Sequence, residues 1–175
     1  MKNDTRKVIL YAFGLFVGMN GIANIAFAAN TSLKGVTING VALCDGMAKA
    51  SEVLKKQGFL KNMPDSQISQ SVKSNILSGQ KSESGAKYRF AIMSTKGTGK
   101  VDSINYRVTG LKDMDSPFEE ARVHIQQVSG LKLGCLARNG GKFCKYAKDG
   151  NSVNLVAATR GKPKLTINIM GNCPP

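Results

Sequence analysis

Four cysteines and one histidine are the side chains in this sequence best suited to chemistry. The cysteines could bind zinc, supply a nucleophilic thiolate or pair as disulfides, and the histidine could act as a general base: Cys44, Cys135, Cys144, Cys173 and His124. Structural zinc sites use closely spaced ligands, and no C-x₂₋₄-C pair occurs here. A nucleophilic cysteine requires a free thiol with a lowered pKa. We therefore expect no metal and no cofactor, and the compartment decides whether the cysteines are free or paired.

The first 28 residues have the pattern of a secretory signal peptide. A basic start precedes a largely apolar run that closes on an A-x-A pattern: Lys2, Arg6, Lys7, residues 8–27 and Ala26-Phe27-Ala28. We expect cleavage after Ala28, which leaves residues 29–175 as a single domain in the periplasm or outside the cell. The alternative is a retained membrane anchor, because about 20 apolar residues can span a bilayer. Asn20 and Asn24 argue against that alternative.

An oxidising compartment favours disulfides, and four cysteines allow three pairings. Asn139-Gly140 is the strongest short signal for a two-residue hairpin turn, and a hairpin with that turn places Cys135 opposite Cys144. Counting from the turn also puts this pair at a non-hydrogen-bonded position, where side chains approach closely. By elimination Cys44 pairs with Cys173, which would join the start of the domain to its end.

Other candidate catalytic patterns fail on their context. His124 follows Glu120 by four residues on a predicted helix, which is usual for a surface or interface histidine. Ser129-x-x-Lys132 has the spacing of penicillin-recognising enzymes, but the serine falls at the end of that helix. Residues 97–100 lack the spacing of a phosphate-binding loop and fit a hairpin turn. Asp113 and Asp115 are expected to shape the loop before the helix.

The strongest remaining signal is positive charge. Without residues 1–28, the 25 basic and 11 acidic side chains fall to 22 and 10, because Lys2, Arg6, Lys7 and Asp4 are removed. The basic excess is concentrated after Gly130, and we predict a binding surface there for a protein or an anionic envelope polymer or lipid. Nucleic acid is not expected, because the chain has no Trp and only four Tyr for base stacking. The candidate binding residues are Lys142, Lys145, Lys148, Arg160, Lys162 and Lys164.

The elements that must position these residues follow from periodicity and turn signals. We expect an extended lead-in over 36–43, helices over 47–57, 65–77 and from 116 to 129, a mobile loop over 78–87, and strands over 88–95, 100–109, 131–137, 142–147, 153–159 and 164–170. Asp45 is the expected N-cap of the first helix and Ser116 that of the third. The order predicts an α+β fold of two layers, an antiparallel sheet with two or three helices packed on one face.

Residues 36–59 contain a run of apolar and glycine positions that also occurs in known envelope proteins. Gly40, Leu43, Gly46, Met47, Glu52, Val53, Gly58 and Phe59 carry this likeness. The segment resembles the opening of small bacterial envelope proteins with the SmpA/OmlA (BamE) and β-lactamase-inhibitor-protein type of helix-helix-sheet unit. That resemblance implies protein binding across a sheet face rather than catalysis, and a second, degenerate unit that starts at Ser116.

The sequence therefore predicts an exported, non-enzymatic binding protein of the bacterial envelope that uses a basic C-terminal sheet. An inhibitor of an envelope hydrolase or β-lactamase is the alternative, and it would bind its target tightly and stoichiometrically. A third hypothesis, a hydrolase, requires a cleft that joins His124 to a carboxylate or a serine.

Overall fold

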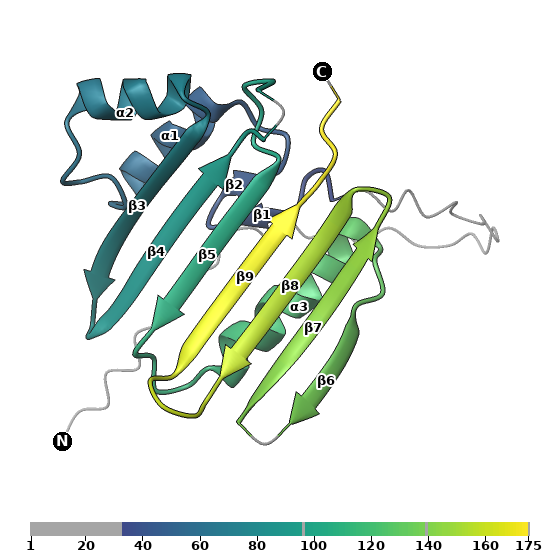
Figure 1. Cartoon of the computed structure of the whole chain (residues 1–175). Helices are drawn as coiled ribbons and strands as arrows, with labels where there is room; N and C mark the ends of the chain where they lie inside the picture. The colour runs from purple at the N-terminus through teal and green to yellow at the C-terminus, as the bar shows by residue number, and fades with distance from the viewer. Residues whose placement is uncertain (1–32, 96, 139, 175) are drawn as a thin grey trace, which may run out of the picture.

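A seven-stranded antiparallel sheet dominates the structure, a computed structural model that describes residues 33–95, 97–138 and 140–174. The predicted signal peptide lies outside the described residues. Three helices and two short strands accompany the sheet in the described part of the chain (Figure 1). The elements are β1 (Thr37–Ile38), β2 (Val41–Ala42), α1 (Met47–Lys56), α2 (Asp65–Lys73), β3 (Ile76–Glu83), β4 (Ala86–Met93), β5 (Ser103–Thr109), α3 (Asp115–Ser129), β6 (Gly134–Arg138), β7 (Gly141–Lys148), β8 (Asn151–Ala158) and β9 (Lys164–Met170).

The strands lie in the order β3-β4-β5-β9-β8-β7-β6, so two meanders meet where β5 pairs with β9. In Figure 1 the sheet faces the viewer, and α1 and α3 lie behind the strands. Along the central strands, buried apolar side chains point to that far side and alternate with more polar side chains that point to the near side, as in a sheet with one covered face. One row of this buried side crosses five strands through Phe90, Tyr106, Ile167, Leu155 and Cys144. The predicted α+β architecture with helices on one face is confirmed.

The structure corrects the prediction for residues 65–87. The helix α2 ends at Lys73, because Asn75 adopts a left-handed conformation with φ 59°, and β3 replaces most of the expected mobile loop. This strand looked like a loop because it is an edge strand with only Leu77 fully buried. Gly79 has a packing role: a Cβ there would lie 2.5 Å from the carbonyl oxygen of Phe59.

The expected lead-in over 36–43 is a small hairpin. Asn39 and Gly40 have φ values of 47° and 71°, and they join β1 to β2 in a two-residue turn of the type that Asn-Gly favours. The same dipeptide signal that predicted the turn at 139–140 thus also operates here.

Two expected helix caps are also corrected. The N-cap of α1 is Gly46, and the Asp45 carboxylate instead accepts a hydrogen bond from the Ala42 amide and pairs with Lys49. Ser116 lies inside α3, whose start is held by Asp113. The Asp113 carboxylate accepts hydrogen bonds from the Asp115 amide and the Ser116 hydroxyl, which lower its pKa. Asp113 therefore shapes this loop, as expected.

Both predicted disulfides are present. Cys135 lies opposite Cys144 with Cα atoms 4.0 Å apart, in the predicted register, although Asn139 of the turn lies outside the described residues. Cys44 is bonded to Cys173 and joins the segment before α1 to the end of the chain. No helix within the described ranges has the length and apolar character needed to cross a membrane.

Candidate binding face

The side of the large sheet that faces away from the helices carries polar side chains on all seven strands. We call it the open face and define it as the strand positions that alternate with the buried row. On β4, for example, Phe90 and Ile92 are buried, so Arg89 and Ala91 belong to the open face. The register of the pairs carries this assignment across all seven strands.

The open face is positively charged and lacks acidic side chains. Its basic residues come from β4, β5, β6, β7 and β9: Lys87, Arg89, Arg107, Arg138, Lys145 and Lys164. None of the ten Asp and Glu residues in the described part of the chain occupies an open-face position of a strand. The field above the face is therefore positive with no local compensation, which favours an anionic partner.

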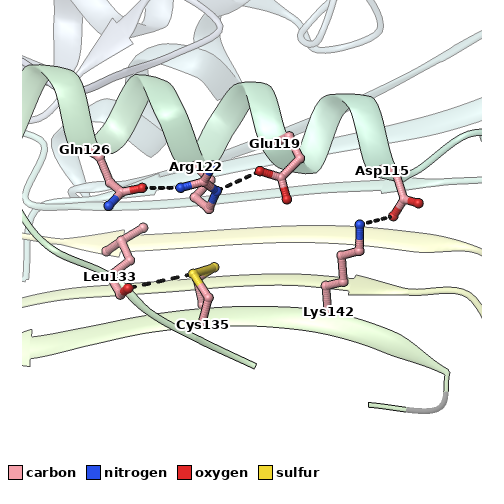
Figure 2. A network of polar contacts seen from close by, with 8 residues as sticks. Asp115, Glu119, Arg122, Gln126, Leu133, Cys135 and Lys142 are labelled. Carbon is pink, nitrogen blue, oxygen red and sulfur yellow. Dashed lines mark hydrogen bonds and ion pairs between the residues drawn. A yellow bond between two sulfur atoms is a disulfide. The ribbon is translucent and has the colours of Figure 1, made fainter. Parts of the chain in front are cut away.

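The carboxylates instead compensate charges in the helical layer and the loops. In α3, Glu119 accepts a hydrogen bond from Arg122, which also donates to Gln126 (Figure 2). Asp115, in the first turn of α3, pairs with Lys142 at 3.1 Å. The carboxylates lie outside the open face because strand alternation sorts the side chains between the two sides of the sheet.

The open face also carries a row of amide side chains and a row of apolar side chains. Three asparagines stand directly opposite one another on β5, β9 and β8, namely Asn105, Asn168 and Asn154, and the first two are hydrogen-bonded through their side chains. In the neighbouring row, Val156, Phe143 and Leu136 continue across β8, β7 and β6. Leu136 is 53% exposed, so the β6 end of the face is apolar. The face therefore combines basic residues with an amide row and an apolar row.

The structure divides the six predicted binding residues between different places. Lys145 and Lys164 lie on the open face. Figure 2 shows Lys142 on the side of the strands that faces α3, where it pairs with Asp115. Lys148 also belongs to β7 and lies on the same side of the sheet as Lys142. Its Nζ is 3.9 Å from a carboxylate oxygen of Asp149.

Arg160 and Lys162 belong to the turn between β8 and β9. The side chain of Arg160 packs against Gly140, where an added Cβ would lie only 2.8 Å from it. The predicted patch is therefore not a single surface. Sequence reasoning missed the basic residues Lys87, Arg89, Arg107 and Arg138. For Arg89 and Arg107, alternation with apolar residues along the predicted strands 88–95 and 100–109 was the signal that could have found them.

A hollow of about 540 Å³ opens where β3, β4 and β5 meet the segment after α1. Arg89, Arg107, Gln80 and Asn105 contribute to its lining. Met63 from the segment after α1 contributes an apolar wall. The backbone of that segment is held to the sheet edge, because the Phe59 carbonyl oxygen accepts a hydrogen bond from the Gln80 amide.

His124 lies away from this hollow. Its Nε2 is 3.1 Å from the Thr37 hydroxyl, so it connects α3 to β1. It lines neither this hollow nor a second one beside the start of α2. Within the described residues, no three His, Cys, Asp or Glu side chains gather as metal ligands would.

Comparison of the chain with protein-family models, curated proteins and solved structures finds no match.

Proposed function

We propose that this protein is an exported, non-enzymatic binding protein of the bacterial envelope whose open face engages the acidic surface of a protein partner. The observation that carries the proposal is the uncovered sheet face with six cations and no carboxylate. Like charges gathered on one face without counter-charges weaken the folded state, and packing of the sheet does not require them. A partner with the opposite charge removes that cost.

The size and texture of the face support a protein as the partner. Seven strands about 4.8 Å apart and about 25 Å long form a face of roughly 700 Å², which is close to the ~800 Å² that each partner contributes to a standard interface. Arginines beside an apolar area at Val156, Phe143 and Leu136 are typical of protein interfaces. An electrostatic contact with lipid or a polymer has no need of the asparagine row or the apolar area.

Two disulfides support the exported location, since such bonds persist in oxidising compartments. One of them, Cys44–Cys173, encloses nearly the whole described domain, as is common in proteins that must survive outside the cytoplasm.

Matched charge removal tests the proposal. The open-face variant replaces Lys87, Lys145 and Lys164 with Gln. The control variant replaces three exposed lysines of α1, α2 and the loop between them, Lys56, Lys61 and Lys73, and thus loses the same net charge. Both variants of the oxidised domain are used to capture proteins from an envelope extract at low and moderate salt.

We expect the open-face variant to lose the protein captured by the wild type and the control to retain it. Equal capture by both variants would contradict the proposal. Recovery of anionic vesicles rather than protein would assign the face to lipid. If the captured protein is an enzyme, and the complex is stoichiometric, persists at moderate salt and lacks the enzyme's activity, this protein is an inhibitor of that enzyme.

A further inference from the structure

Two arginines of the open face stand directly opposite each other. Arg89 on β4 pairs with Arg107 on β5, and side chains in such positions have Cβ atoms about 5 Å apart. Like charges in this arrangement destabilise a sheet. Among the described residues neither guanidinium takes part in an ion pair, so the chain carries this repulsion without a counter-charge of its own.

The same row contains buried polar atoms that lack hydrogen bonds. The Nε of Arg107 and the Oγ1 of Thr166 are both buried without a hydrogen-bond partner. These residues are directly paired across β5 and β9, and Thr166 is only 7% exposed. An arginine has only donors, so an oxygen atom is what its Nε lacks. Native proteins leave few such groups unsatisfied, because each costs free energy.

Arg89 and Arg107 both line the hollow at β3, β4 and β5, beside this row. Gln80 and Asn105, whose side-chain amides can donate hydrogen bonds, also contribute to its lining. Gln80 also stands directly opposite Arg89, so one row presents an amide, two guanidiniums and a hydroxyl in succession. This set of donors matches an oxygen-rich anionic group.

We propose that Arg89 and Arg107 form a carboxylate-binding site that anchors acidic side chains of the partner, an inference that rests on the proposed function. Arginine recognises a carboxylate through two parallel hydrogen bonds, and two adjacent arginines can hold one carboxylate or a neighbouring pair. The carboxylate is favoured over a phosphate because the remainder of the open face has the composition of a protein interface.

Hexaglutamate with blocked termini and inorganic phosphate, at equal ionic strength, are the probes. The side-chain Nε–H resonances of Arg89 and Arg107 are followed by NMR in the oxidised mature domain. Arg89→Gln and Arg107→Gln are compared with Lys87→Gln, which removes one charge from the same face, on the strand that carries Arg89. We expect each arginine variant to weaken hexaglutamate binding about ten-fold or more, and the lysine variant by less than about three-fold.

Denaturant unfolding of each variant checks that the arginine substitutions act on binding rather than on folding, since relief of the repulsion should leave stability unchanged or higher. Equal weakening by all three substitutions, or no shift of either Nε–H resonance, overturns the site. Phosphate binding at the two arginines without hexaglutamate binding assigns the site to phosphate and overturns the carboxylate. The lysine triple variant that tests the proposed function keeps both arginines, so the failure of one proposal is distinguishable from the failure of the other.

Discussion

The two disulfides should contribute unequally to stability, and the difference follows from the lengths of chain they enclose. The sequence separations are 129 residues for Cys44–Cys173 and 9 residues for Cys135–Cys144. In the chain-entropy treatment, closing these loops raises the free energy of unfolding by about 5 and about 2.6 kcal/mol. Replacing both cysteines of a pair with Ala should therefore cost about 2.4 kcal/mol more for the long-range bond than for the hairpin bond.

The surroundings of the two bonds agree with this order. Cys173 is 6% exposed, and its bond holds the segment before α1 against the end of the chain. The hairpin bond ties β6, an edge strand whose five residues are all exposed, to β7. Loss of the hairpin bond should free that edge and leave the rest of the sheet paired.

Urea unfolding at pH 7, followed by circular dichroism on both double-alanine variants, measures the difference, and mass spectrometry confirms that the remaining bond is intact. Because about 5 kcal/mol is comparable to the whole stability of many domains, an unfolded Cys44→Ala/Cys173→Ala variant also fits the expected order. Equal losses, or a larger loss for the hairpin variant, would refute the chain-entropy reasoning.

Three other predictions concern the packing and ionisation of the fold. Gly79→Ala should lower the free energy of unfolding by about 2 kcal/mol in urea titrations, because its Cβ would meet the Phe59 carbonyl oxygen. Gly46→Ala meets no atom within 4 Å and should cost less than about 1 kcal/mol, through the weaker N-cap of α1 alone. Burial raises the pKa of Tyr106 to about 12, so its stability contribution is complete below pH 10 and is lost as the pH rises toward 12. Tyr106→Phe should remove that alkaline loss, and an unchanged slope between pH 10 and 12 would contradict the assignment. The lowered pKa of Asp113 predicts stability that is lost in acid as the carboxylate protonates, and acid unfolding of Asp113→Asn should lack this component.

Periodicity and turn chemistry predicted most of the elements. The helices α1 and α3 and six of the sheet strands appear near their predicted positions, because their apolar residues recur with the period of one buried face. The strand β3 was missed since an edge strand with one buried residue has no such period. In α3 the residue types do not reveal the buried side at its end: Val128 is 44% exposed, whereas Ser129 is buried and its hydroxyl donates a hydrogen bond to the Ile125 carbonyl oxygen.

The candidate binding face was only partly predictable. Counting lysines after Gly130 grouped residues by their distance along the chain, whereas alternation places Lys142 and Lys145 on opposite sides of the same strand. The arginines of the proposed carboxylate site lie on β4 and β5, outside that basic stretch. The two arginines are neighbours because of the register between β4 and β5, and counting charges along the chain does not reveal that register.

The sequence by itself determined the hairpin disulfide, the α+β class and the excess of positive charge, because each depends on residue types and on spacings within one turn or one element. The Cys44–Cys173 pair followed from the hairpin bond by elimination. The tertiary structure alone decided which charges share a surface. The β5–β9 pairing brings Arg107 beside Thr166 across more than fifty residues of chain, and the helices cover one side of the sheet only. Long-range strand pairing sets such neighbours, and it is the cumulative result of burying every element at once rather than a property of any one segment.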